Sequence, residues 1–267
     1  MKHRMSRSSR VPSKSNRIAA SSRSTSSEAA QQPDGRSLLA VVAHPDDEAY
    51  GPGGTLAYYA DRGVDVYLAC ATRGEAGRRR GSPPFVSQSE LGGVRVRELH
   101  CSARILGVKD IFLLDLPDGG IAGFDPPEAA LRLARVIRQT APQVLIAFGP
   151  GGSLSPHPDH VAVSHLAAAA VLTLAPAERP RRIFHYLSTW RSSPEDHTDR
   201  RPVVVDIGAY RLRRLQALKC HLTQVQQVPW LFGDEGQVAA TFPAEDRFLL
   251  VDPPAGDGSP ADLFDGI

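Results

Sequence analysis

The sequence predicts an α/β protein, with a Rossmann-like, doubly wound and mainly parallel sheet that carries helices on both faces. The first observation is that apolar, strand-like runs alternate with helical segments from residue 38 to residue 148. This alternation favours parallel strands joined by right-handed crossovers. The second is that polar residues cluster directly after two of the most apolar runs, 38–43 and 143–148. In the strand order 3-2-1-4-5, the first and fourth strands are neighbours, and ligands bind at their carboxyl ends.

Each element is predicted from its apolar pattern and its boundaries. Short apolar runs bounded by turn residues indicate strands, whereas longer segments with apolar residues three or four apart indicate helices. A proline near the start of the segment 127–139 fits the first turn of a helix. The expected strands are 38–43, 65–71, 110–114, 143–148, 183–190 and 203–206, and the expected helices are 54–62, 90–106, 127–139, 162–174 and 210–221.

Composition divides the chain into three regions. Residues 1–36 are rich in Ser and carry eight Lys or Arg against two acids, without apolar periodicity, so we expect a disordered tail. Residues 37–252 are expected to form a single domain, and residues 253–267, rich in Pro, Gly and Asp, a loose C-terminal tail. Without the net +6 of the basic tail, the net charge of +2 becomes about −4 for the rest of the chain.

These properties narrow the partners and the compartment. The acidic balance of the main region gives no reason to expect nucleic acid binding, since the basic residues of the tail are scattered among serines. No run of about 18 apolar residues and no apolar signal segment is found, so we expect neither a membrane span nor secretion, and a cytoplasmic location. The oligomeric state stays open.

The three cysteines lack the spacing of a zinc-thiolate site or of a disulfide framework. Cys70, Cys101 and Cys220 lie far apart and are odd in number. We therefore expect them to be buried and reduced.

Two histidine- and aspartate-containing motifs follow the first and fourth strands. His44, Asp46 and Asp47 come directly after the run 38–43, and His157, Asp159 and His160 follow the run 144–148 and a loop rich in Gly, Ser and Pro. Imidazole nitrogens and carboxylate oxygens are a zinc-type ligand set. Because the first and fourth strands are expected to be neighbours, topology brings the two motifs together, and the sequence predicts a metal site there.

The motifs occur in an order that resembles the PIG-L, or LmbE-like, family of zinc-dependent de-N-acetylases. The resemblance extends from about residue 38 to residue 224, and it rests on the combination of motifs. The segments that carry it are 43–48 (AHPDDE), 53–56 (GGTL), 72–77 (TRGEAG), 106–108 (LGV), 116–119 (LPDG), 157–160 (HPDH) and 214–224 (RLQALKCHLTQ), the last with Arg214 and Thr223 where the family usually has Lys and Ser.

The resemblance implies a role for each motif residue. It implies that His44, Asp47 and His160 hold the metal, Zn²⁺ or another divalent ion such as Fe²⁺, and that three protein ligands leave a position for water. It further implies a general base, Asp46, and a protonated partner of the reaction, His157. Two more roles are implied: Asp159 orients or tunes His157, and Asp118 binds substrate hydroxyls.

The function that the resemblance implies is hydrolysis of an N-acetyl, or other N-acyl, group from a small-molecule amino sugar or glycoconjugate. An amidase acting on thiol conjugates, or an antibiotic-tailoring deacylase, would use the same residues. Two His and one carboxylate also form the facial triad of non-haem Fe(II) oxygenases, although strand-helix alternation argues against that fold. A metal-stabilised sugar-binding protein without turnover is a further alternative, against which Asp46 and His157 speak.

Overall fold

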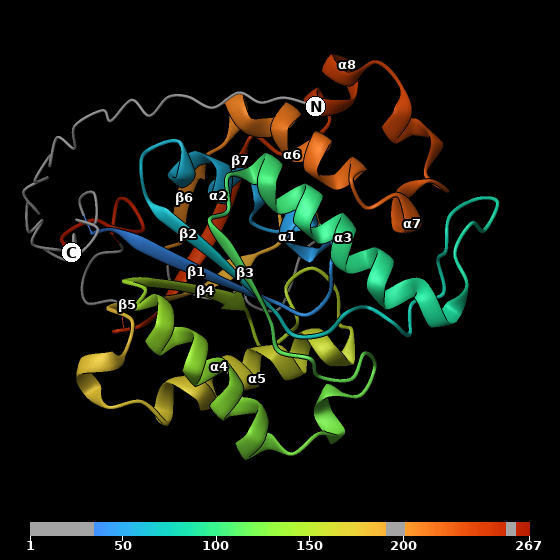
Figure 1. The fold of residues 1–267 in the computed structure, drawn as a ribbon. Coiled ribbons are helices and arrows are strands. Elements are labelled where there is room, and N and C mark those ends of the chain that lie inside the picture. Colours follow the sequence, from blue (N-terminus) through green and yellow to red (C-terminus); the bar gives the residue numbers. More distant parts are fainter. Residues whose placement is uncertain (1–34, 191–200, 255–259) are drawn as a thin grey trace, which may run out of the picture. The chain divides into compact units, whose positions relative to one another are not determined.

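The computed structural model describes residues 35–190, 201–254 and 260–267, and these residues build a seven-stranded sheet covered by helices (Figure 1). The strand order is β3-β2-β1-β4-β5-β7-β6. The strands β1 to β5 run parallel to one another, whereas β7 pairs antiparallel with both β5 and β6. The strands are β1 (Ser37–Val42), β2 (Asp65–Cys70), β3 (Asp110–Leu113), β4 (Val144–Phe148), β5 (Arg182–Leu187), β6 (Val203–Asp206) and β7 (Glu245–Asp252).

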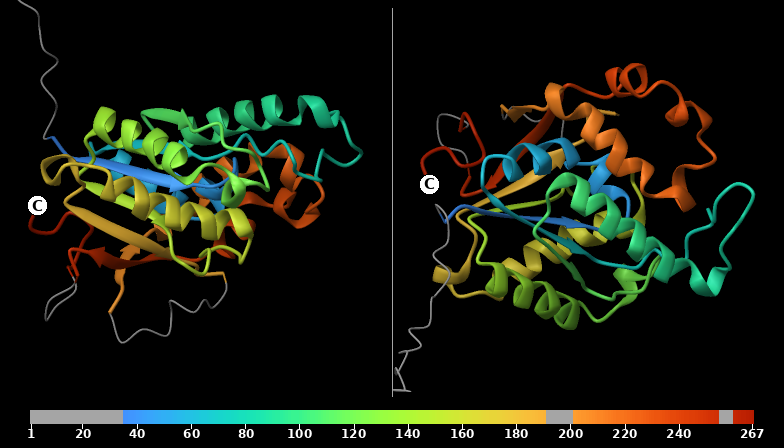
Figure 2. Two further views of the ribbon diagram at one scale, coloured as in Figure 1. Left: turned by 90° about the horizontal axis from the view of Figure 1, so that it is seen from below. Right: turned by 45° about the horizontal axis from the view of Figure 1, so that its top comes forward.

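The helices lie on both faces of the sheet. The helices α4 and α5 cover one face, and α2, α3 and α6 cover the other, as the further views in Figure 2 also show. The α-helices are α1 (Asp47–Tyr50), α2 (Gly53–Ala60), α3 (Gln88–Leu106), α4 (Pro126–Thr140), α5 (Pro158–Leu172), α6 (Arg211–Lys219), α7 (Leu222–Val225) and α8 (Glu235–Ala240), and short 3₁₀ turns include η1 (Ile121–Gly123), η2 (Pro176–Glu178), η4 (Gly208–Tyr210) and η5 (Pro229–Phe232).

The predicted fold class is confirmed, including the order 3-2-1-4-5 of the parallel strands. Two differences matter for the site. The helix expected from residue 162 begins at Pro158, so the second motif occupies its first turn. The strand β7 was not predicted, and it extends the sheet beyond β5.

Local sequence explains where the helices begin and end. The helix α3 is preceded by the N-cap Ser87, whose side chain and that of Glu90 form a capping box, and it is followed by the C-cap Gly107, where φ is 79°. At the start of α4, the Asp125 side chain accepts a hydrogen bond from the Glu128 backbone N–H.

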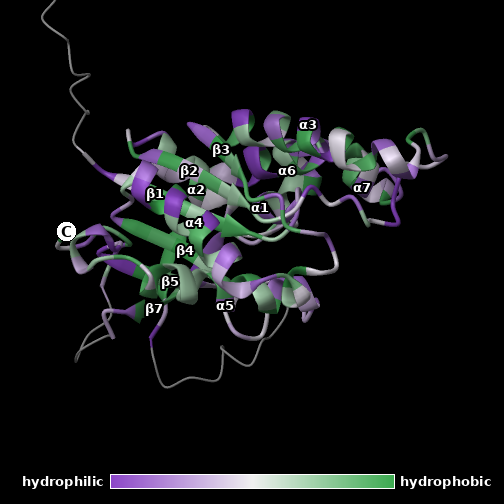
Figure 3. Cartoon of the chain, turned by 60° about the horizontal axis from the view of Figure 1, so that its bottom comes forward, coloured by the Kyte–Doolittle hydropathy of each residue, from purple (hydrophilic) through white to green (hydrophobic). Residues whose placement is uncertain are grey.

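The core lies between the sheet and the two helix layers. All six residues of β1 are buried, because both faces of this central strand are covered, and Figure 3 shows the hydrophobic colouring concentrated in the strands. Pairing of β1 with β2 on one side and β4 on the other satisfies its backbone groups as well. The strand ends that carry the two motifs are therefore held on a rigid scaffold.

The expected tails differ in what the structure describes. Residues 1–34 lie outside the described residues, so the disordered N-terminal tail stays a prediction. In the expected loose end, residues 255–259 also lie outside them, but residues 260–267 pack against the domain. Leu263 and Phe264 are buried, and the Tyr59 hydroxyl donates to Asp262 over 2.8 Å.

The expectation that all three cysteines are reduced is wrong for two of them. Cys70 is buried and free, as predicted, but Cys101 and Cys220 form a disulfide, with their Cα atoms 5.8 Å apart. They are 119 residues apart in sequence, and packing of α3 against α6 brings them together. Spacing along the chain carries no signal for such a pair.

Within the described parts of the chain, none of the helices combines the length and the apolar character needed to cross a membrane.

Candidate metal centre

The first motif lies in a tight turn between β1 and α1. The backbone of Asp46 adopts a φ of 123°, which is rare for a residue with a side chain, and Asp47 opens the short helix α1. Two contacts hold this turn: Asp46 N–H donates to Glu48 Oε2 over 3.0 Å, and Arg95 donates to the Pro45 carbonyl over 2.5 Å. A strained conformation at a strand end is typical of functional sites.

The second motif lies at the start of α5, across the boundary from β1 to β4. His157 is the N-cap residue, and Asp159 and His160 lie in the first turn. Because β1 and β4 pair directly, the two motifs meet although they are more than a hundred residues apart. This is the convergence that the predicted strand order requires.

The three predicted ligands lie close enough together to hold one ion. The possible ligand atoms of His44, Asp47 and His160 are all within 4.8 Å of one another, and all three residues are buried. His160 Nε2 lies 3.2 Å from Asp47 Oδ1, and His44 Nδ1 lies 3.5 Å from Asp47 Oδ2. Two imidazoles and a carboxylate suit zinc, so the donor set fits the group that the sequence implies.

The other nitrogen of His44 faces two more carboxylates. His44 Nε2 lies 3.1 Å from Asp118 Oδ1 and 3.2 Å from Asp159 Oδ2. Metal-ligating histidines commonly donate their second N–H to a carboxylate, which fixes the ring orientation. The imidazole is therefore positioned with Nδ1 towards Asp47.

Negative charge is in excess around His44. Burial alone would lower the pKa of His44, but hydrogen bonds to Asp118, Asp159 and Asp47 outweigh burial and raise it to about 12. The cluster thus favours a positive charge at this point, which a proton or a metal cation can supply. A second candidate group, His44, His157 and Asp159, shares His44 with the first.

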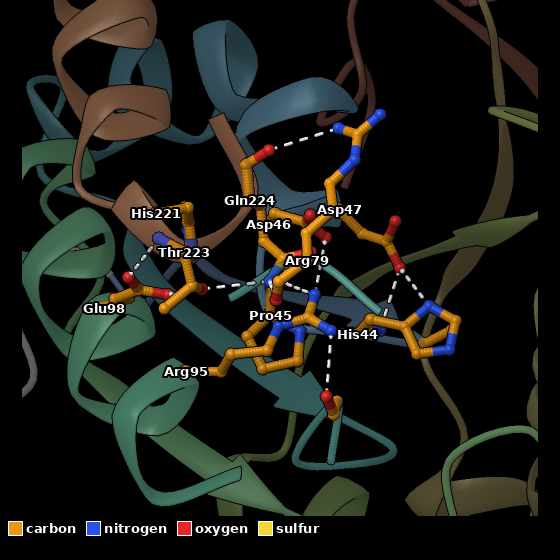
Figure 4. A network of polar contacts seen from close by, with 12 residues as sticks. His44, Pro45, Asp46, Asp47, Arg79, Arg95, Glu98, His221, Thr223 and Gln224 are labelled. Carbon is orange, nitrogen blue, oxygen red and sulfur yellow. Dashed lines mark hydrogen bonds and ion pairs between the residues drawn. The ribbon is translucent and has the colours of Figure 1, made fainter. Parts of the chain in front are cut away.

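Asp46 lies beside the ligands without belonging to their set. Burial raises the pKa of Asp46 to about 6, although the Arg95 guanidinium, 3.3 Å from Asp46 Oδ1, acts in the opposite direction. Figure 4 shows Arg95 reaching both Pro45 and Asp46 from α3. A carboxylate that titrates near pH 6 can act as a general base at neutral pH.

A set of buried hydrogen bonds, which we call the brace, supports the turn; it is formed by Glu48 with Ser102 and His221, and by Glu98 with Thr223. Glu48 Oε1 accepts hydrogen bonds from Ser102 over 2.5 Å and meets His221 Nε2 at 2.6 Å. Close by, Glu98 accepts from the Thr223 N–H and hydroxyl over 2.7 and 2.6 Å (Figure 4). The two ends of this brace come from α3 and from the start of α7, so the C-terminal half of the domain helps to hold the first motif.

The remaining predicted site residues are placed in unexpected ways. His157 is exposed, and its Nδ1 accepts from the Asp159 backbone N–H over 3.2 Å. The Asp159 carboxylate instead accepts from the Gly119 and Ile121 N–H groups and faces His44. Asp118 accepts from Ala76 N–H over 2.8 Å, and its side chain is only 8% exposed. Both carboxylates therefore contact a predicted metal ligand.

A cavity of about 560 Å³ opens next to the ligands. Asp46, Asp47 and His160 form part of its wall, together with Arg79 and Ser155. The sequence pointed to no residue of its apolar part, which comes from Tyr50, Leu154, Trp190, Leu218, Val228, Trp230, Leu231 and Phe242. Apolar residues scattered over several elements follow no motif spacing, so only the fold shows that they converge. Arg95 and Glu98 were missed too, because they read as ordinary positions of a predicted helix.

The sheet and the convergent His and Asp residues define a doubly wound α/β protein with a candidate metal centre at its topological switch point. The family model described as "PIG-L: GlcNAc-PI de-N-acetylase" matches residues 39–171. Together with the relatives below, this match shows that the chain belongs to the PIG-L, or LmbE-like, family.

Three similar proteins illustrate the relationship. A probable N-acetyl-alpha-D-glucosaminyl L-malate deacetylase 2 of Bacillus anthracis is 32% identical over 189 residues, which are 71% of this chain and 81% of the relative. A 1D-myo-inositol 2-acetamido-2-deoxy-alpha-D-glucopyranoside deacetylase of Saccharomonospora viridis is 30% identical, over 86% of this chain and 100% of the relative. The solved structure of N,N'-diacetylchitobiose deacetylase from Pyrococcus horikoshii matches with a TM-score of 0.61 and 26% identity, over 81% of this chain and 84% of that one.

Proposed function

We propose that this protein is a zinc-dependent hydrolase that removes the N-acetyl group from a small-molecule amino sugar or glycoconjugate. The observation that carries the proposal is the convergence of His44, Asp47 and His160 within 4.8 Å, with Asp46 beside them. The names of the relatives support it, since they are deacetylases of N-acetylated amino sugars.

His44, Asp47 and His160 would hold the metal. When bound, zinc would polarise the substrate carbonyl and lower the pKa of a coordinated water towards neutrality. Asp118 and Asp159 hold the His44 ring through Nε2, so that Nδ1 keeps its direction towards Asp47. We therefore assign these two carboxylates to positioning a ligand.

Asp46 takes the proton of the attacking water. We infer that it reaches the attacking water from its position next to Asp47 and in the cavity wall, and a pKa of about 6 leaves it mostly deprotonated at pH 7. The water oxygen then forms a bond to the acetyl carbon. Arg95 keeps the Asp46 turn in place through the Pro45 carbonyl.

His157 completes the reaction on the amine side. Its exposed imidazole, with a ring centroid 5.0 Å from that of His44, is available to donate a proton to the leaving nitrogen. When the C–N bond breaks, the products are acetate and the free amino sugar. Asp46 takes one proton of the water and His157 gives one to the nitrogen, while the second proton of the water leaves with the acetic acid, which ionises to acetate. Return of the Asp46 proton to His157 through solvent restores both groups.

The test combines metal analysis with a screen for free amine. The purified protein is expected to contain about one zinc-class ion per chain. It should release amine from at least one compound of a panel that holds the N-acetyl-α-glucosaminides of malate and of inositol and N,N'-diacetylchitobiose. A chelator should abolish release, and added zinc should restore it. Full activity of a metal-free preparation, or a zinc-loaded protein that releases no amine from any member of the panel, would contradict the proposal.

A further inference from the structure

The cavity beside the metal centre is far larger than an acetyl group needs. It measures about 560 Å³, which is within the range of pockets that bury a whole small molecule. The named relatives share the acetyl group and differ in what the amino sugar carries, namely malate, inositol or a second sugar. The space beyond the metal centre is therefore available for the part of the substrate that varies.

Four aromatic residues, Tyr50, Trp190, Trp230 and Phe242, form what we call the aromatic wall of this cavity. They come from α1, from the segment after β5, from η5 and from the segment after α8. Trp190 is 42% exposed and Trp230 is 53% exposed, although large aromatic side chains are usually buried. Exposed aromatic surface inside a concave site next to catalytic residues indicates ligand binding.

Contacts within the protein hold Trp190 in place before any ligand binds. Its indole N–H donates to the Tyr50 carbonyl over 3.2 Å, and its ring meets Phe242 edge to face, with centroids 5.0 Å apart. The buried Arg214 guanidinium lies 5.6 Å from the Trp190 ring centroid. A preformed aromatic surface binds a flat apolar group without losing further side-chain entropy.

The guanidinium of Arg79 suits the same kind of flat group. Its guanidinium donates to the Gln224 carbonyl over 3.1 Å, and Gln224 donates back to the Arg79 carbonyl, so the side chain is held at the cavity (Figure 4). A guanidinium plane stacks on aromatic rings. The wall and Arg79 together offer several aromatic or planar faces around one space.

We propose that the cavity binds an aromatic aglycone, attached to the anomeric carbon of the N-acetylated amino sugar, and that Trp230 determines this specificity. The inference rests on the proposed deacetylase function and names its substrate class. The acetyl group stays at the metal ligands, and the aromatic ring of the aglycone packs against the aromatic wall.

The first experiment compares two substrates that differ only in the aglycone. These are the phenyl and methyl α-glycosides of N-acetylglucosamine, with free amine as the readout on the zinc-loaded, full-length protein. The phenyl glycoside should have a kcat/KM about tenfold higher, because an aromatic pair in a desolvated site contributes on that order. Equal values for the two glycosides would overturn the inference and leave the deacetylase function intact.

A matched pair of variants locates the effect. Trp230 and Phe232 are both exposed aromatic residues of η5, 53% and 44% exposed, but only Trp230 lines the cavity. In Trp230→Ala the ratio of phenyl to methyl kcat/KM should fall to about one, mainly through the KM for the phenyl glycoside. Phe232→Ala should keep the wild-type ratio. A ratio that survives Trp230→Ala would overturn the role of Trp230.

Two controls separate the remaining explanations. Inhibition of the wild-type protein by phenyl and methyl α-glucosaminide, which lack the acetyl group, tests the same preference without relying on a variant that folds. Equal inhibition would contradict the inference. A methyl glycoside with an N-octanoyl group tests the other occupant: if it is preferred over both acetylated substrates, the cavity binds the acyl chain and the aglycone assignment is wrong. Release of amine from none of the substrates would instead overturn the proposed function itself.

Discussion

The candidate metal-ligand cluster around His44 and the Arg214–Asp246 pair are both buried groups of charges, but only in the pair do the charges balance within the protein. Arg214 donates through Nε to the Ala49 carbonyl, through Nη1 to Asp246 and through Nη2 to the Tyr50 carbonyl, over 2.9, 3.1 and 2.5 Å. Asp246 in turn accepts from the Thr55 N–H and hydroxyl. One cation, one anion and a set of dipoles satisfy each other there.

The cluster around His44 has no such balance. Three carboxylates, those of Asp47, Asp118 and Asp159, lie against the His44 imidazole. The basic partner that Asp47 has besides His44 is His160. The consequence is the raised pKa of His44. A buried cluster that is closed on itself stabilises the fold, whereas one with excess negative charge attracts a cation. An arginine suits position 214 better than a lysine would, because the guanidinium fork reaches three acceptors in fixed directions.

Substitution of the adjacent acids Asp46 and Asp47 should have the largest effect on activity, and it tests the cluster around His44 directly. Asp46→Ala should keep the metal but lose about 10²- to 10⁴-fold in turnover, the usual contribution of general acid-base catalysis. Asp47→Ala should lose the metal first, since it removes the carboxylate that meets both His44 and His160. Metal content per chain and kcat, measured on the same preparations, check both statements.

His157→Ala serves as the control for this pair. It should behave like Asp46→Ala, with zinc content near one ion per chain and a changed limb of the pH-rate profile. If Asp46→Ala emptied the site while Asp47→Ala retained the ion, the two carboxylates would have to exchange roles.

Substitution in the Arg214–Asp246 pair should lower the free energy of unfolding. Arg214→Met leaves the Asp246 carboxylate buried without its partner, which costs about 3–5 kcal/mol in the free energy of unfolding. Burial already raises the pKa of Asp246, and Arg214 is the main opposing influence, so its loss raises that pKa further. Urea unfolding of the metal-free protein measures the change without interference from the ion.

An exposed pair provides the matched control. Lys109 and Asp65 lie 2.6 Å apart, but the lysine side chain is 52% exposed. Lys109→Met should change the free energy of unfolding by less than about 1 kcal/mol. Similar losses in the two variants would contradict the distinction between closed buried and solvated pairs.

The sequence predicts the parallel half of the sheet and the ligand set because both depend on local patterns. Apolar runs mark β1 to β5, and the crevice rule places whatever follows β1 beside whatever follows β4. The proximity of His44, Asp47 and His160 could therefore be predicted from the sequence. Their roles as ligands also drew on the family resemblance.

What the sequence misses depends on packing between distant segments. The strand β7 joins the sheet antiparallel to β5, and nothing in its own pattern shows this partner. Cys101 meets Cys220 only because α3 packs on α6. The direction of the Asp159 carboxylate, towards His44 and two backbone N–H groups, follows from the position of the loop before η1. Such contacts have no period and no spacing that a single sequence could show.

Arg95 tests whether a neighbouring cation tunes the pKa of Asp46. Burial raises the pKa of Asp46 to about 6, and Arg95 opposes this by favouring the charged carboxylate, so Arg95→Gln should raise the pKa further. Because the base must be deprotonated, activity increases as pH rises through its pKa, and the acid limb of kcat/KM should move to higher pH.

The limb for Arg95→Lys should lie between those of the wild type and Arg95→Gln, since the lysine keeps the charge but cannot reach the Pro45 and Gly74 carbonyls together. A bound ion acts on Asp46 in all three proteins, so comparison at equal zinc content isolates the contribution of Arg95. An acid limb that stays in place while kcat falls at every pH would show that Arg95 supports the turn without influencing the base.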